Sequence, residues 1–326
     1  MVVVGAVPPL ARVAGVLGLA GALCRLVVPA FPLAKVPGGP SLGAAAGPAD
    51  WLVLVPLVGA IGVAGVLCVR GRLPRLGLAI LMGAGVVQSA VMLHAFYLSY
   101  AGPRSTLDLP VNISVSMRYH VGAGLVLLII ATGLLSTAQT VAVVAWARTV
   151  MEDDGSLDPL RPRFAVFGLL AAAFAMLVLG MAPYTSSLYG SALSNGAPPS
   201  SVLERAGLDY LAGLTLVLGV AIWSTAAAAL RPRLATVGIY VGLAAALATE
   251  ALSTALLASR SRVIGTSVGG VGTWFAVAFF AALAFAAWRL PVASGTPSDG
   301  GQPAGERHPA PKDPDDDPPE GWWIQS

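Results

Sequence analysis

The chain has 326 residues, of which 56% are hydrophobic and only 11% are charged. A soluble domain carries about 25% charged residues, so this composition excludes an ordinary soluble protein and indicates an integral membrane protein. The net charge of +3 comes from arginines that flank apolar stretches, and it gives no support for nucleic-acid binding.

Eight apolar stretches follow one another along the chain, and a transmembrane helix needs about 20 such residues. They cover residues 13–31, 51–69, 76–97, 121–147, 164–182, 211–230, 234–258 and 270–290. We therefore predict an all-α, polytopic membrane helix bundle with eight transmembrane helices. No phosphate-binding loop, nucleophile elbow, zinc signature or dinucleotide fingerprint occurs in it, so we predict a non-enzymatic protein without cofactors.

Sequence landmarks recur in the same order in both halves of the chain. Asp-aromatic-Leu opens the second and sixth stretches, Pro-Arg-Leu leads into the third and seventh, and Gly-x-Gly opens the fourth and eighth. These landmarks are residues 50–52 and 209–211, 74–76 and 232–234, and 122–124 and 270–272. We predict two tandem four-helix repeats, residues 1–150 and 151–290, related by a pseudo-twofold axis along the membrane normal.

Arginines gather in the short connections on one side of the predicted membrane. They are Arg70, Arg72, Arg75, Arg148, Arg161, Arg163, Arg231 and Arg233. Because cytoplasmic loops carry an excess of basic residues, we predict that both termini are cytoplasmic. Arginine greatly outnumbers lysine, which is typical of a high-GC bacterial genome, so the plasma (inner) membrane of a bacterium is the expected location.

Residues 291–326 are rich in Pro and Asp and too polar to bury themselves, so we predict a disordered cytoplasmic tail. The tail ends in Trp322, Trp323 and Ile324. Its acidic run is repelled by anionic lipid, and exposed tryptophans are typical anchors in protein interfaces. We expect these three residues to dock on a cytosolic protein partner.

Glu250 is the only acidic residue deep inside an apolar stretch. Small residues at every fourth position of the same stretch, among them Gly238, Gly242 and Ala246, favour close helix packing. An ionisable group at this depth is costly, so Glu250 is expected to face protein or water. It either binds a proton, a cation or a ligand, or it fastens helices together with Thr254 nearby; both interpretations stay open.

Two further polar residues lie inside predicted helices. Arg25 stands at a similar depth to Glu250 and is its candidate partner if the two helices touch. The interpretation that we favour is that the Arg25 side chain extends to the outer headgroups. Gln88, in the middle of the third stretch, is also a candidate for ligand binding, but the interpretation that we favour is helix packing through a hydrogen bond across the interface of the two repeats.

Four residues at the outer rim form a weaker group of candidates. They are His94, His120, Asp50 and Asp209. The two histidines lack the spacing of a metal site, and an Asp at a helix N-terminus is explained by its favourable interaction with the helix dipole. We therefore predict no metal, and an outer-rim enzyme is the least favoured function.

Two functions remain. The first is a subunit or assembly factor of a cell-envelope membrane complex, with the bilayer, other membrane proteins and a tail-bound cytosolic protein as partners. The alternative is a small-molecule or proton-coupled transporter that uses Glu250 at the interface of the two repeats. The first is favoured because polar residues are sparse inside the helices and because neither repeat contains an obvious Gly/Pro break in mid-helix.

Overall fold

The computed structural model describes residues 9–35, 41–42, 47–101, 106–109, 113–116, 120–146, 161–181, 207–229, 233–260 and 271–289. The chain divides into two units, Met1–Leu290 and Pro291–Ser326. All described residues belong to the first unit. The predicted tail, with Trp322, Trp323 and Ile324, lies outside the described residues.

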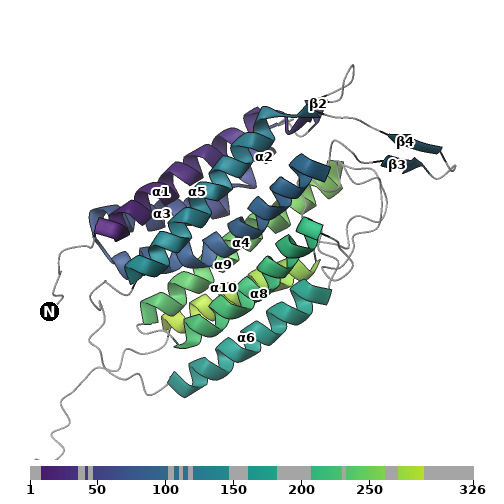
Figure 1. Cartoon of the computed structure of the whole chain (residues 1–326). Coiled ribbons are helices and arrows are strands. Elements are labelled where there is room, and N and C mark those ends of the chain that lie inside the picture. Colours follow the sequence, from purple (N-terminus) through teal and green to yellow (C-terminus); the bar gives the residue numbers. More distant parts are fainter. Residues whose placement is uncertain are drawn as a thin grey trace, which may run out of the picture. The chain divides into compact units, whose positions relative to one another are not determined.

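The described part of the chain is mostly helical, and each predicted apolar stretch coincides with a helix (Figure 1). The long helices are α1 (Pro9–Val27), α3 (Val55–Arg70), α4 (Pro74–Ala101), α5 (Ala123–Trp146), α6 (Arg161–Met181), α8 (Gly207–Ala229), α9 (Arg233–Arg260) and α10 (Val271–Arg289). Two short helices, η1 (Val28–Ala30) and α2 (Ala49–Leu52), lie between α1 and α3.

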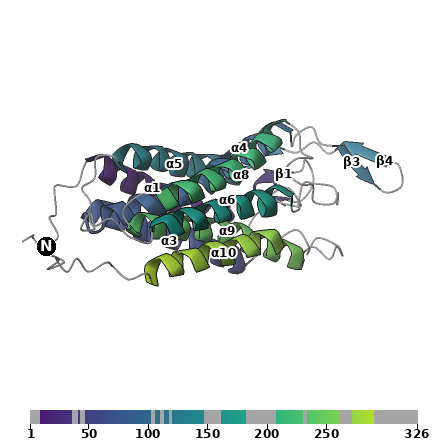
Figure 2. The same cartoon turned by 90° about the horizontal axis from the view of Figure 1, so that it is seen from below.

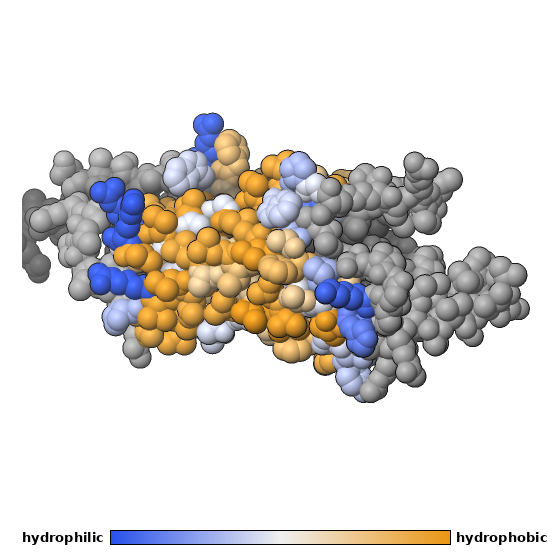
Figure 3. Space-filling view, turned by 90° about the horizontal axis from the view of Figure 1, so that it is seen from above, coloured by the Kyte–Doolittle hydropathy of each residue, from blue (hydrophilic) through white to orange (hydrophobic). Residues whose placement is uncertain are grey.

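Among the described residues, 5 helices are long and apolar enough to cross a membrane. They contain Pro9–Ala30, Pro74–Tyr100, Ala123–Trp146, Tyr210–Ala227 and Leu234–Ser253. The other three predicted stretches form shorter apolar helices. Figure 3 shows apolar side chains covering the helices, with hydrophilic residues near both ends. These features indicate a membrane protein.

Short strands occur in connections where the sequence analysis predicted none. Strands β2 (Ser41–Leu42), β1 (Ala34–Lys35) and β5 (His120–Val121) pair antiparallel in that order. A separate hairpin, β3 (Thr106–Leu109) with β4 (Ile113–Ser116), extends beyond the helix ends in both views (Figures 1 and 2). Apolar and polar residues alternate in β3 and β4, as expected for strands. Strands β1, β2 and β5 have only two residues each, which is too short for such an alternation to be recognised in the sequence.

The second apolar stretch is broken into two helices, which the sequence analysis did not predict. Helix α2 ends at Leu52 and α3 begins at Val55, with Pro56 in its first turn. Proline has no N–H, and inside a helix its ring clashes with the carbonyl group four residues earlier, here that of Leu52. A new helix therefore begins at the proline.

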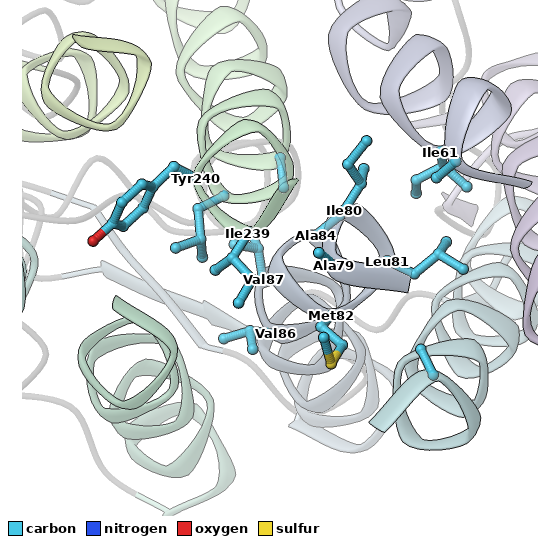
Figure 4. Close-up of a cluster of buried hydrophobic side chains, with 14 of the residues drawn as sticks. Ile61, Ala79, Ile80, Leu81, Met82, Ala84, Val86, Val87, Ile239 and Tyr240 are labelled. Atoms are coloured by element: carbon cyan, nitrogen blue, oxygen red, sulfur yellow. The ribbon is translucent and has the colours of Figure 1, made fainter. Parts of the chain in front are cut away.

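Helices α4 and α9 form the centre of the bundle. Of the 5 candidate spans, those in α4 and α9 are the most enclosed, each with 78% of its residues buried. Helix α4 packs on α9, α5, α8 and α3, and α9 also packs on α10, α3 and α8. The buried side chains between them form one hydrophobic cluster (Figure 4).

Glycines bring the backbones of α4 and α9 into direct contact. A Cβ atom on Gly83 would touch the carbonyl oxygen of Ile239 and lie 3.1 Å from the Leu243 nitrogen. A Cβ on Gly238 would lie 2.6 Å from that of Ala79. The seam between α4 and α9, which we define by these backbone contacts, therefore has no room for side chains at its glycines.

We expect Gly83→Ala to destabilise the protein. An Ala normally stabilises a helix by about 1 kcal/mol relative to Gly, but overpacking a filled core costs about 1–3 kcal/mol. Gly59→Ala in α3 is the matched control, because a Cβ there meets nothing within 4 Å. The midpoint of unfolding of the detergent-purified protein should fall for Gly83→Ala and stay equal or rise for Gly59→Ala. Equal midpoints in the two variants would contradict the tight seam.

Candidate functional site

Glu250 is buried on the side of α9 that faces the seam. Its side chain is 4% exposed, which agrees with the expectation that it faces protein rather than lipid. It follows Ile239 by eleven residues, which is three helical turns on the same face. Ile239 points from α9 into the space beside α4 (Figure 4), and its carbonyl group contacts Gly83. Glu250 therefore lies on the face of α9 that packs against α4.

The neighbouring residue, Thr249, links α9 to the beginning of α3. Its Oγ1 accepts a hydrogen bond of 3.2 Å from the backbone N–H of Leu57. This N–H is in the first turn of α3, where backbone donors have no partner inside the helix. The sequence analysis missed this contact, although a Thr beside an intramembrane Glu was a visible signal. One turn further on, Ser253 is buried, and its Oγ has no hydrogen-bond partner among the described residues.

Arg25 is buried inside the bundle, so the favoured interpretation that it extends to the outer headgroups is wrong. Its side chain is 1% exposed. Glycines on the same side of α1 allow the neighbouring helices to cover it. A Cβ on Gly18 would lie 2.8 Å from Leu81 of α4, and one on Gly21 would lie 2.7 Å from Leu135 of α5.

Arg25 and Gln88 stand opposite each other. Gly18 of α1 faces Leu81 of α4, and Arg25 and Gln88 each follow seven residues later. Seven residues are about two helical turns, and α1 and α4 run in the same direction because α3 is antiparallel to both. The same register therefore places the two side chains on facing sides at one level.

Both side chains have polar atoms without a hydrogen-bond partner among the described residues. They are Nε and Nη2 of Arg25, and Nε2 and Oε1 of Gln88. Gln88 is fully buried, at 0% exposure. The hydrogen bond predicted for Gln88 across the interface of the repeats is thus not formed with any described residue.

Helix packing also argues against the pair of Arg25 with Glu250. Helix α1 packs on α3, α5 and α4, whereas α9 packs on α4, α10, α3 and α8. Helices α3 and α4 thus stand between the two residues. The buried polar groups form two adjacent sets, Arg25 with Gln88 inside the first four helices and Glu250 at the seam.

The outer-rim candidates lie on separate elements. His94 is buried on α4, with its ring centroid 6.2 Å from that of Tyr97. His120 is exposed on β5, opposite Lys35 of β1. Asp50 lies in the first turn of α2, and its Oδ2 accepts a 3.1 Å hydrogen bond from the Gly47 N–H.

Two candidate side chains lie outside the described part. Asp209 is in the first turn of α8 and Thr254 is in α9, and the structure describes only the backbone of each. Within the described ranges, no three His, Cys, Asp or Glu side chains are arranged to hold a metal ion.

A polar contact between α4 and α5 was also missed. The Ser89 hydroxyl lies 2.9 Å from that of Ser136 and 3.2 Å from Oε1 of Gln139. Further along α5, Thr137 and Thr140 are exposed and donate to carbonyl groups of their own helix. A few serine and threonine residues barely lower the mean hydropathy of an apolar helix. The sequence analysis, which searched for apolar stretches and charged residues, therefore missed these hydroxyl groups.

We expect Thr249→Val, which keeps the shape but removes the acceptor, to destabilise the protein by about 1–3 kcal/mol, because it leaves the buried Leu57 N–H without a partner. Thr249→Ser keeps the hydroxyl group and should recover most of the loss. The unfolding midpoint of the purified variants measures both effects. If Val and Ser were equally stable at this position, the hydrogen bond to α3 would not contribute to stability.

The chain was compared with protein-family models, curated proteins and solved structures, and none of them matches it.

Proposed function

We propose that the chain is an eight-span plasma-membrane protein made of two tandem four-helix units, with both termini in the cytoplasm. The seam supports this arrangement. The repeated Pro-Arg-Leu turns begin at Pro74 and Pro232, an offset of 232 − 74 = 158 residues. A Cβ on Gly238 would lie 3.3 Å from the nitrogen of Ile80, which is 158 residues earlier.

The same offset recurs one turn further along α9. A Cβ on Gly242 would lie 2.8 Å from the nitrogen of Ala84, which is again 158 residues earlier. Two parallel helices related by a twofold axis along their length bring equivalent residues face to face. The remaining contacts are also reciprocal: α4 packs on α8, and α9 packs on α3, each being the second long helix of the other unit. This pattern supports a pseudo-twofold axis that passes between α4 and α9.

We further propose that the protein transports a small polar solute or couples such transport to protons, with Glu250 at the interface of the two units. The observation that carries this proposal is the burial of Glu250 on the face of α9 toward the seam, beside Thr249, which holds the first turn of α3. Ionisable residues inside membranes mark substrate and ion pathways. A carboxylate at the seam is placed to respond when the two units move.

The break between α2 and α3 is the second support for transport. Transporters commonly form their binding sites from discontinuous helices, and the apparent lack of a break was the sequence argument against this function. Leu54 caps the N-terminus of α3. Ile61 of α3 lies against Gly18 of α1. Leu54 precedes Ile61 by seven residues, and Arg25 follows Gly18 by seven residues. Because α1 and α3 are antiparallel, the break lies at the level of Arg25.

The second candidate function is a subunit or assembly factor of a membrane complex. Thr137 and Thr140 on α5 are exposed within an apolar helix. Small and hydroxylated residues on a lipid-facing surface fit the close approach of a partner helix. In this function, Trp322 and Trp323 of the tail dock on a cytosolic protein.

One comparison separates the two functions. Proteoliposomes containing the wild type, Glu250→Gln, Glu250→Ala or a chain lacking residues 291–326 are incubated with the small-molecule fraction of the source cells. Mass spectrometry then measures the retained solutes. For a transporter, we expect at least one solute to accumulate with the wild type and with the tail deletion. Its retention should fall about tenfold or more with Glu250→Ala, because this change removes the buried carboxyl group that the proposed pathway uses.

The opposite pattern supports a subunit. In that case the tail deletion loses a protein that co-purifies with the wild type, and both Glu250 variants behave as the wild type in every assay. Gly59→Ala, which changes an exposed position, is the control for general effects of substitution. Solute retention that is equal in all variants would contradict transport.

A further inference from the structure

The guanidinium group of Arg25 is a buried charge for which the described residues provide no acidic partner. The guanidinium group is a cation with five N–H donors and no acceptor. Helix α1 and the helices that pack on it, α3, α4 and α5, contain no Asp or Glu at all. A buried charge without compensation is strongly unfavourable, so an anion from outside these helices is needed.

The open atoms of Arg25 are those that a carboxylate uses. Nε and Nη2, which have no hydrogen-bond partner among the described residues, lie on the same edge of the guanidinium plane. Their two N–H groups are parallel and match the two oxygens of one carboxylate in a bidentate contact. A monatomic anion makes no such pair of parallel bonds.

Two neighbouring features complete the site. The Nε2 of Gln88, opposite Arg25, is a further donor without a partner among the described residues. The N-terminal end of α3 lies at the level of Arg25, and helix N-termini favour negative charge. Near this level the Trp51 Nε1 donates to the Leu26 carbonyl group at 3.0 Å, which fixes α2 beside α1. Arg25 and Gln88 therefore offer donors at one level of the bundle, and the N-terminal end of α3 lies at the same level.

We propose that Arg25 and Gln88 bind a small free carboxylate in the outer half of the first four-helix unit. Arg25 holds the carboxylate through Nε and Nη2, and Gln88 donates through Nε2, leaving its Oε1 to accept a hydrogen bond from the remainder of the ligand. A lipid headgroup does not fit, because the Arg25 side chain is only 1% exposed. The role of this carboxylate as a transported solute rests on the proposed function, whereas its binding does not.

The test uses the full-length protein in a neutral detergent, with acetate as the probe. The midpoint of thermal unfolding is followed by tryptophan fluorescence in sodium acetate or sodium chloride at equal ionic strength and constant pH. We expect acetate to raise the midpoint in a saturable way that chloride does not reproduce. Gln88→Leu should weaken the apparent acetate affinity about tenfold, because it removes a hydrogen bond to a charged group, and Arg25→Gln should abolish the effect.

Matched variants separate the site from general charge effects. Arg12→Gln removes an exposed arginine from the same helix and should respond to acetate as the wild type does. Arg25→Lys keeps the charge but loses the bidentate edge, so it tests the geometry if Arg25→Gln does not fold; we expect about a tenfold loss of affinity or more.

Several results would overturn the proposal: acetate no better than chloride, the same response in the Arg25 and Arg12 variants, or stabilisation by inorganic phosphate but not by acetate. Failure of the proposed function is recognised separately. Acetate binding without Glu250-dependent solute retention would remove transport and keep the site. Solute retention without acetate stabilisation would remove the site and keep transport.

Discussion

The backbone contact between α4 and α9 is the constraint on which the other features depend. Because Gly83, Gly238 and Gly242 carry no side chain, the two helices meet at their main chains. In a bilayer, lipid tails are as apolar as leucine, so helix association relies on this kind of close packing more than on the hydrophobic effect. The contact sets the register of α4 against α9, and Glu250 lies on the side of α9 that faces this contact.

Two sets of buried polar residues lie beside this contact. Arg25 and Gln88 lie inside the first four helices, and Glu250 lies on the side of α9 toward the seam. Thr249 connects the two regions, because it stands beside Glu250 and accepts the Leu57 N–H from the first turn of α3. A displacement of α9 relative to α4 therefore also acts on the end of α3 that lies level with Arg25. This connection is the physical basis for involving both sets in the transport function proposed above.

Much of the fold could be predicted from the sequence, because helices in apolar stretches of about 20 residues follow from composition alone. Pro56 marks a break that hydropathy does not register, since Val53 and Leu54 on its N-terminal side are apolar. The depth of Glu250 could be predicted, but the direction of Arg25 could not. Whether an arginine extends to the headgroups or stays inside depends on how closely glycines such as Gly18 and Gly21 let other helices approach, and a single sequence does not contain that distance.

The seam also bears on why two copies would be joined in one chain. In the proposed duplication, Gly238 and Ile80 occupy equivalent positions, as do Gly242 and Ala84, and in each pair the glycine lets the backbone of the other helix approach. A symmetric homodimer has the same residue at both positions, so it could not place a glycine on one helix alone. Gene fusion removes that restriction, so each half can diverge to complement the other, and Glu250 could arise in one half while Met92 stands at the corresponding place in its counterpart.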